Sequence, residues 1–208
     1  IHGASKVAGS DADFERVGLN VPGVRSALAD LHAEVIADRG GRDDICALAE
    51  LSFLYAEDTG NRSYFLAAMV SAYTFLFPGQ GHSYPDPFDP RFRLAADLYN
   101  RGITAGFASE DGSEVDLRSG TYPLPFDELA VELDEAGLRW GDRKLVHFVP
   151  VAELEVRGLR ERYRRTGIGA PLAANTASWT PGESFSDFVG KTAKVPVTAL
   201  LRIDDARR

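Results

Sequence analysis

The chain has 208 residues, of which 44% are hydrophobic and 26% are charged. This composition is typical of one large or two small folded domains and excludes a disordered, collagen-like or coiled-coil protein. The formal net charge of -8 and the pI near 5.0 repel phosphate backbones on average, so nucleic acid is not an expected partner. The single cysteine, Cys46, excludes an internal disulfide and a cysteine-based zinc site.

Neither a transmembrane segment nor a leader is expected in this chain. The longest apolar stretch, residues 64–77, is shorter than the roughly 18 residues that a membrane span needs, and Ser71 and Thr74 interrupt it. The chain begins with Ile1 and His2, without a methionine or a charged and then apolar leader. This start predicts a mature or excised piece of a protein, and no cellular compartment is predicted from it.

Residues 1–110 are expected to form a bundle of about four helices. Over residues 22–39, apolar side chains recur at helical spacing, and Gly40-Gly41 marks the end of this helix. The second helix is expected to begin at Asp43-Asp44, whose carboxylates suit a helix N-terminus, and to close at Thr59-Gly60.

The third and fourth helices follow with clear start signals. Asn61 can cap a helix over residues 64–76 that is apolar or small on almost every face, which is typical of a buried central helix. The second and third helices have the length of one helical-repeat unit, but only one copy is found, so no solenoid is predicted. Asp89-Pro90 supplies an N-cap and a first-turn proline for the fourth helix, which runs through Ile103.

Residues 111–208 are expected to form an antiparallel β region, packed with the bundle as one α+β unit. Alternating patterns predict strands at residues 114–118, 129–133, 145–149 and 195–203. Gly141-Asp142 is expected to be the tight turn of a hairpin. Residues 160–183, rich in Gly, Pro, Ser and Thr, are expected to be a long irregular loop.

The motifs that would carry catalysis or cofactor binding are weak. Gly81-His82-Ser83 is the nearest approach to a nucleophile elbow, but it lacks the final glycine and follows a helix instead of a strand. The four histidines are scattered, and Gly167-Ile168-Gly169 lacks the third glycine of a dinucleotide-binding loop. No catalytic residue, metal or cofactor is therefore expected.

One cluster of charge stands out as a candidate contact site. Four guanidinium groups lie within six residues, at Arg160, Arg162, Arg164 and Arg165. Such a cluster can hold a carboxylate, a phosphate or an acidic surface, so it is a candidate contact with an anion or with another domain. The alternative is a solvated loop that offsets the acidity of the chain.

Five segments resemble one known group of proteins. They cover most of the chain between residues 20 and 203 in the same order, at residues 47–55, 89–102, 154–160, 167–172 and 195–201. In these segments the chain resembles the N-terminal region of large bacterial α/β-hydrolase proteins of the esterase or lipase type, a poorly characterised group. The resemblance implies that a catalytic domain with its own nucleophile follows this region, and it assigns no catalytic residue to the chain itself.

The function expected from these observations is that of a non-catalytic accessory region. It would pack on the catalytic domain of the same polypeptide and shape or cover the entrance for an acyl substrate. Two alternatives stay open, a stand-alone helical module that binds a partner segment and a small hydrolase that uses either Ser83 and His82 or the arginine cluster. The oligomeric state is not predicted.

Overall fold

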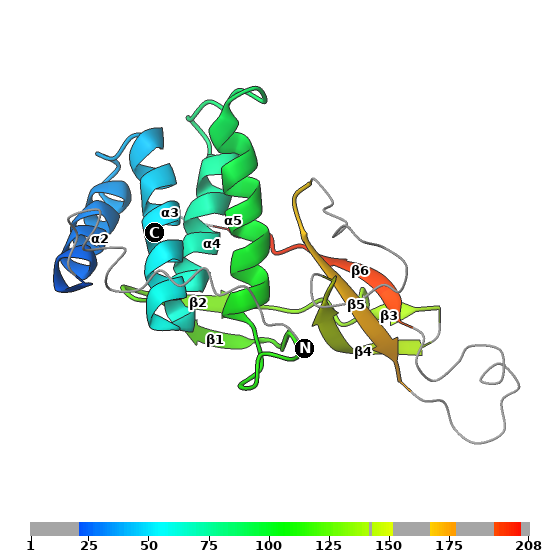
Figure 1. The fold of residues 1–208 in the computed structure, drawn as a ribbon. Helices are drawn as coiled ribbons and strands as arrows, with labels where there is room; N and C mark the ends of the chain where they lie inside the picture. The colour runs from blue at the N-terminus through cyan, green and yellow to red at the C-terminus, as the bar shows by residue number, and fades with distance from the viewer. Residues whose placement is uncertain (1–20, 142, 152–166, 178–193, 205–208) are drawn as a thin grey trace, which may run out of the picture.

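The protein has an α+β fold in which four helices precede antiparallel sheets. A computed structural model describes residues 21–141, 143–151, 167–177 and 194–204. Helices α2 to α5 lie side by side, the β1–β2 hairpin crosses one end of the bundle, and a second sheet lies beside α5 (Figure 1). The predicted α+β class with an N-terminal helical part is confirmed.

The helices begin and end close to the predicted residues because local capping signals are satisfied. The helices are α2 (Val21–Ile36), α3 (Arg42–Thr59), α4 (Arg62–Leu76) and α5 (Pro90–Gly106). The side chain of Asn61 accepts a hydrogen bond from the Ser63 amide at 3.1 Å, and that of Asp89 accepts one from the Arg91 amide at 2.9 Å. Gly60 closes α3 in the left-handed conformation, with φ of 68°.

Helix α4 is the centre of the bundle, as its apolar surface predicts. It packs against both α3 and α5, and Leu66, Met69 and Phe75 are each at most 2% exposed. Helix α5 approaches it closely at Gly102, where a Cβ atom would lie 2.7 Å from the Met69 Cβ and 2.8 Å from the Phe65 carbonyl oxygen. Glycine is therefore required at this helix crossing for steric reasons.

Two antiparallel sheets make up the β region. The first is the hairpin of β1 (Gly120–Pro123) and β2 (Glu128–Val131). The second has four strands in the order β3-β4-β5-β6. Its strands are β3 (Arg139–Trp140), β4 (Arg143–Pro150), β5 (Ala170–Thr176) and β6 (Val195–Ala199). The predicted turn between β3 and β4 is confirmed, since Trp140 pairs with Arg143 and Gly141 has φ of 63°.

The expected strand at residues 114–118 was wrong. Val115 forms only an isolated bridge with Ala108, and its amide donates to the Phe148 carbonyl, whereas the Asp116 amide donates to the Phe107 carbonyl. Because neighbouring amides of this segment bond to different parts of the chain, no continuous ladder can form.

The expected irregular loop over residues 160–183 contains a strand that its residue pattern did not predict. Strand β5 occupies Ala170–Thr176 at the centre of the four-stranded sheet. Its alanines at positions 170, 173 and 174 are at most 4% exposed, and α5 packs against this strand. Small side chains allow the helix to approach, but they lack the β-branched pattern by which strands are recognised. The predicted last strand is shorter than expected, because β6 ends at Ala199.

Two adjacent residues of α5 tie the bundle to the four-stranded sheet. The Tyr99 hydroxyl donates to the Leu201 carbonyl at 2.6 Å and accepts from the Leu201 amide at 2.7 Å. The Asn100 side chain donates to the Gly167 carbonyl at 2.8 Å and accepts from the Gly169 amide at 2.6 Å. Both residues form hydrogen bonds with backbone amides and carbonyls next to the ends of β5 and β6. These bonds fix the position of the sheet on α5.

Candidate functional site

The arginine cluster predicted as a contact site lies outside the described residues. This applies to Arg160, Arg162, Arg164 and Arg165 alike. The candidate sites of the described residues lie elsewhere, on the loop between α4 and α5 and in a cavity within the bundle.

The loop between α4 and α5, residues 77–89, is held by hydrogen bonds at two points. The Asp86 side chain accepts from the Phe88 amide at 2.9 Å, and the Asp86 carbonyl accepts from the Asp89 amide at 2.9 Å. The Arg42 guanidinium, from the first turn of α3, donates to the Ser83 carbonyl at 2.6 Å and to the Ser83 hydroxyl at 3.0 Å. The loop therefore has a defined backbone although it lies at the surface.

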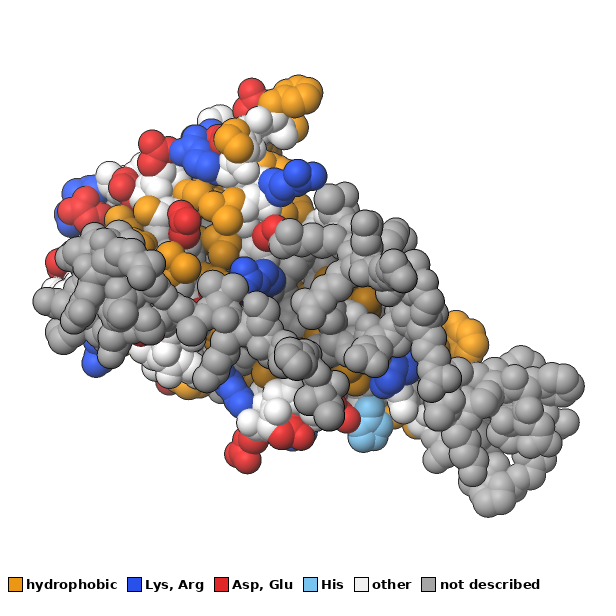
Figure 2. Space-filling model, in the orientation of Figure 1, with side chains coloured by type: hydrophobic (Ala, Val, Ile, Leu, Met, Phe, Trp, Pro, Cys, Tyr) orange, Lys and Arg blue, Asp and Glu red, His pale blue; other side chains and the backbone are white. Residues whose placement is uncertain are grey.

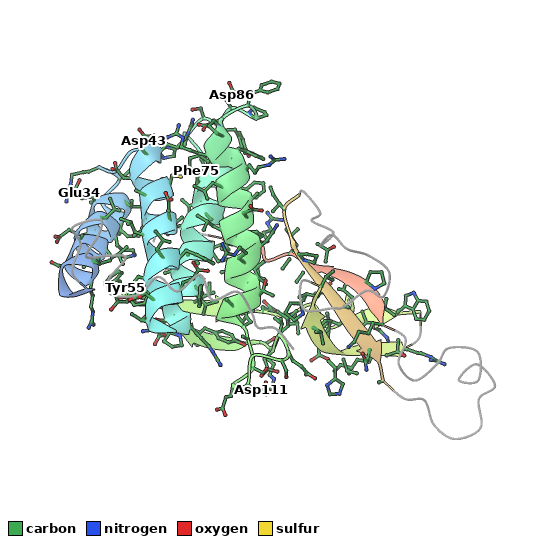
Figure 3. All side chains as sticks on the ribbon, viewed as in Figure 1. Glu34, Asp43, Tyr55, Phe75, Asp86 and Asp111 are labelled. Atoms are coloured by element: carbon green, nitrogen blue, oxygen red, sulfur yellow. The ribbon has the colours of Figure 1, made fainter. Side chains whose placement is uncertain are left out.

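This ordered loop presents two aromatic side chains to solvent. Phe88 is 93% exposed and Tyr84 is 69% exposed. Figure 3 places Asp86 at the far end of the loop, beyond the ends of the helices. In Figure 2 hydrophobic side chains project at this corner of the molecule beside acidic and basic ones. We call Tyr84 and Phe88 together the aromatic loop face.

An ion-pair cluster beneath the loop joins the N-termini of α3 and α5. The Arg91 guanidinium contacts Asp89 through two nitrogens, at 3.0 Å and 2.7 Å, and also forms an ion pair with Asp43. Hydrogen bonds from Arg91 lower the pKa of the Asp89 carboxyl, and the two carboxylates raise the pKa of Arg91. This bidentate geometry is stronger than that of an ordinary surface pair, so the cluster fixes the base of the loop.

The Ser83 and His82 pair does not have the arrangement of a nucleophile and its base. The Ser83 hydroxyl bonds to Arg42, and a guanidinium is a hydrogen-bond donor only, so it cannot serve as the base. The Nε2 atom of His82 lies 3.8 Å from an Asp38 carboxylate oxygen, and both side chains are substantially exposed. The loop geometry thus supports an anchoring role for Arg42 and gives no support to a serine hydrolase centre at Ser83.

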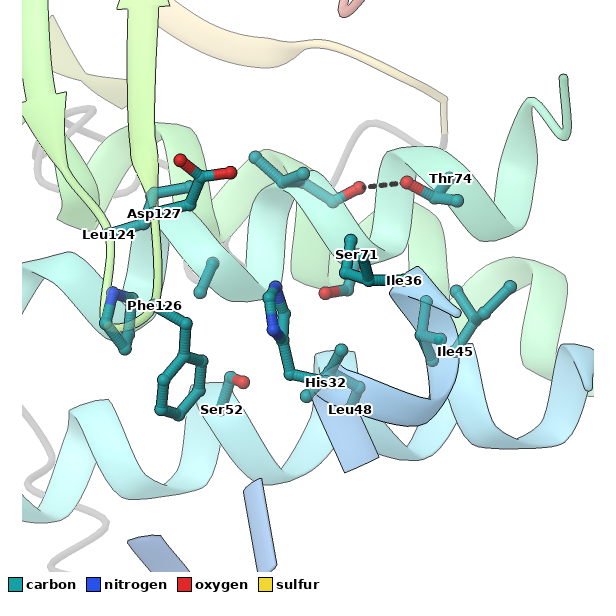
Figure 4. Close-up of a pocket in the computed structure, with 14 residues that line it drawn as sticks. His32, Ile36, Ile45, Leu48, Ser52, Ser71, Thr74, Leu124, Phe126 and Asp127 are labelled. Atoms are coloured by element: carbon teal, nitrogen blue, oxygen red, sulfur yellow. Dashed lines mark hydrogen bonds between the residues drawn. The ribbon is translucent and has the colours of Figure 1, made fainter. Parts of the chain in front are cut away.

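A cavity of about 40 Å³ lies between α2, α3, α4 and the tip of the β1–β2 hairpin. Figure 4 shows the His32 ring projecting into it from α2, between the Ser52 and Ser71 side chains, with Phe126 and Asp127 on the side of the hairpin. Ser52 is 1% exposed and Ser71 is 9% exposed. The other lining side chains are mainly apolar, namely Val35, Ile36, Ile45, Leu48, Ala67, Val70, Leu124 and Pro125.

His32 is the titratable group inside this cavity. Burial lowers its pKa, and the nearby Asp127 carboxylate only partly opposes that shift. The ring lies 5.0 Å from the Phe126 ring, at an interplanar angle of 36°. His32 is therefore neutral at pH 7, and its ring is held between the helices and the hairpin.

The buried thiol of Cys46 and the imidazole of His147 do not form a reactive site. Burial raises the pKa of the Cys46 thiol, so the thiol stays protonated and is a poor nucleophile. His147 pairs with Glu114 at 2.9 Å on an exposed surface, where β4 is bulged and His147 has φ of 54°. Among the described residues, no three histidine, cysteine or acidic side chains are grouped as metal ligands.

Neither candidate site was predicted from the sequence, although the sequence contains signals for both. Phe88 lies two residues after Asp86, the spacing at which an aspartate caps a turn, so an ordered and exposed aromatic could have been expected. Ser52 and Ser71 are polar residues on otherwise buried helix faces. A serine at such a position marks either a bond to its own helix or a polar cavity.

The comparisons with known proteins add no neighbour. No family model, no curated protein and no solved structure matches the chain. Within the described residues, no helix has both the length and the apolar character needed to cross a bilayer.

Proposed function

We propose that the chain is a non-catalytic accessory region that packs on the catalytic domain of an α/β-hydrolase-like protein of the esterase or lipase type. The aromatic loop face is the docking surface in this proposal. The observation that carries it is Phe88, a large apolar side chain left 93% exposed on a loop with a fixed backbone.

The energetics favour a partner for this loop. Burying a phenylalanine side chain stabilises a protein by about 1.5 to 3 kcal/mol relative to leaving it in water. A single exposed apolar residue needs no explanation, but here Tyr84 and Phe88 share one loop, and Arg42 and Asp86 restrain that loop. Because the loop backbone is already restrained, docking has to order only the two side chains and not the whole loop, which lowers the entropic cost of binding.

The kind of partner is inferred from the resemblance of the chain to N-terminal regions of α/β-hydrolases. Ser83 has an arginine for its neighbour and not a base, which agrees with a region whose chemistry lies in another domain. The stand-alone module is less favoured, because the tip of the β1–β2 hairpin already covers the space between α2, α3 and α4.

The first test is genetic and enzymatic. We expect the reading frame to continue beyond Arg208 into a Gly-x-Ser-x-Gly segment, and the isolated chain to be inactive on short and long p-nitrophenyl esters. A frame that ends without such a segment would refute the accessory role. Turnover that disappears in Ser83→Ala would establish the small-hydrolase alternative instead.

The second test addresses the docking surface in the full-length protein. The double variant Tyr84→Ala/Phe88→Ala should speed proteolytic separation of the two regions several-fold. Leu54→Ala is the matched control, because Leu54 is a partly exposed apolar residue of α3, 43% exposed, outside the loop. Equal separation rates in the two variants would show that the loop is not the docking surface.

A further inference from the structure

The cavity in the bundle contains two buried hydroxyls that the fold does not use. Ser52 and Ser71 form no hydrogen bond with any described residue, although they are 1% and 9% exposed. A buried hydroxyl without a partner is unfavourable, because it loses its bonds to water and gains none. The two groups lie on adjacent helices and line the same cavity (Figure 4).

A neighbouring residue shows how the fold satisfies a hydroxyl when no ligand is needed. Thr74, one turn after Ser71 on α4 and lining the same cavity, donates to the Val70 carbonyl at 2.8 Å. Thr59 and Thr104 bond to the carbonyl four residues earlier in the same way. Ser52 and Ser71 do not form this bond, so their hydroxyls can bond to a molecule in the cavity.

Charge and shape restrict the class of that molecule. His32 is neutral, and Asp127 is the one charged side chain of the described cavity lining, so an anion would meet a negative charge and no cation. A buried ammonium would need its counter-charge in the deep part of the site, whereas Asp127 is exposed on the hairpin tip. A neutral group that both donates and accepts fits two serine hydroxyls and an imidazole.

The volume of about 40 Å³ admits only a few non-hydrogen atoms. The apolar side chains Ile36 and Phe126 also line the cavity but are 39% and 36% exposed, so they mark its open side. We propose that the cavity is a binding site for a primary aliphatic alcohol. The CH2OH end bonds to Ser52 and Ser71, and the alkyl chain leaves between Ile36 and Phe126. The accessory role is not needed for this inference.

The experiment is a titration of the 208-residue chain with 1-butanol, followed by amide shifts in NMR spectra. We expect saturable shifts at Ser52, Ser71 and His32, with a dissociation constant in the millimolar range, since so few atoms are buried. tert-Butanol has the same molecular formula, but its hydroxyl-bearing carbon carries three methyl groups and is too bulky for the cavity. It should therefore give no saturable shifts. Saturation by tert-butanol, or none by 1-butanol, would overturn the proposal.

Charged analogues test the assigned class. Butyrate and butylammonium should bind at least tenfold more weakly than 1-butanol. Tighter binding of butylammonium would show that Asp127 and not the serines defines the site. Tighter binding of butyrate would show that His32 is cationic in the complex. Either result would overturn the assignment to neutral alcohols.

Serine variants separate a binding role from a structural one. Ser52→Ala and Ser71→Ala should each weaken 1-butanol binding by about 2- to 10-fold, the usual value of one hydrogen bond. Thr104→Val is the matched control and should leave the affinity unchanged, because Thr104 lies on α5 outside the cavity lining and its hydroxyl bonds to the Asn100 carbonyl. Ser52→Ala should unfold at the same or a higher denaturant midpoint than the natural chain. A lower midpoint would mean that the fold itself uses this hydroxyl, and the proposal would fail.

Discussion

The helical bundle and the four-stranded sheet are stabilised in different ways. In the bundle, α4 is surrounded by other elements, and its side chains interlock with those of α3 and α5. In the sheet, β6 has no fully buried residue and β4 buries only Leu145 and Phe148. The bundle thus has a core of its own, whereas the sheet depends on α5, through the small residues of β5 and the bonds of Tyr99 and Asn100.

If the bundle has a core of its own, the largest loss of stability should come from a substitution at its centre. Leu66→Ala removes a side chain that is 2% exposed, and we expect it to lower the free energy of unfolding by about 2 to 5 kcal/mol. Arg62→Ala, on an exposed part of the same helix, loses one hydrogen bond to the Ser109 carbonyl and should cost less than about 1 kcal/mol. Urea midpoints measure both effects, and similar shifts would show that α4 is not the core.

A double-mutant cycle sharpens this prediction. A Cβ at Gly106 would overlap the end of the Leu66 side chain, so Gly106→Ala alone should destabilise the bundle by about 1 to 3 kcal/mol. In the Leu66→Ala background the same change has room and should cost less, with a coupling of at least 0.5 kcal/mol. Gly79→Ala is the control, because a Cβ there meets no atom within 4 Å. Additive effects would contradict close packing between α4 and α5.

The next largest loss of stability is expected when a hydrogen bond between the bundle and the sheet is removed. Tyr99→Phe leaves the amide and the carbonyl of Leu201 without their partner and should cost about 1 to 3 kcal/mol. Tyr84→Phe removes a hydroxyl from a side chain that is 69% exposed and should cost almost nothing. Hydrogen exchange should speed up at Leu201 and in β6 before it does in α4. Uniform acceleration would mean that the sheet and the bundle unfold together.

Asn100→Asp tests the second contact between the bundle and the sheet, the hydrogen bonds of Asn100 with Gly167 and Gly169. The carboxylate can still accept a hydrogen bond from the Gly169 amide. Its other oxygen cannot donate to the Gly167 carbonyl, as the Asn100 amide does. We expect a loss of about 1 kcal/mol and faster exchange at residues 167–177, with the bundle amides unchanged. Asn100→Ala removes both bonds without adding a repulsion between carboxylate and carbonyl oxygen atoms, so it should also speed exchange at residues 167–177. Unchanged exchange there in Asn100→Ala would contradict the two-bond description.

The smallest effect concerns acid sensitivity at the end of the bundle. Hydrogen bonds from Ser109 and Ser113 lower the pKa of Asp111 to about 2, from an ordinary value of 3.8. Because the folded pKa is depressed, this carboxylate stabilises the turn above about pH 4, and the stabilisation is lost as the pH falls towards 2. Asp111→Asn should therefore reduce the change in thermal midpoint between pH 5 and pH 2.5. An unchanged difference would show that the turn does not titrate.

The sequence predicted the helices well because their ends carry local chemical signals. Asn61, Asp89 and Gly60 act within a few residues of their own positions, so no tertiary information is needed to interpret them. Strand β5 was not predicted because its alanines are suited to close packing against α5 and are not typical strand residues. Helix α5 lies about 70 residues earlier in the chain, so this contact cannot be inferred locally. Residues 114–118 alternate like a strand, but their bonding partners are set by the tertiary fold.

The candidate sites were harder to predict for a similar reason. The loop that carries Phe88 is anchored in part by Arg42, 46 positions before Phe88 by residue number. The cavity depends on Ser52, Ser71 and His32 meeting from three helices under a hairpin tip. Polar residues on apolar helix faces indicate where to look, but only the packing shows whether their hydroxyls are satisfied.

The described four-stranded sheet ends on two strands that are unsuitable templates for another chain. Strand β3 has only two residues, and β6 has five, with Pro196 paired to Ala173. Proline has no amide hydrogen to donate, and short edges offer few bonds to an incoming strand. Edge-to-edge association through the described edges of this sheet is therefore disfavoured.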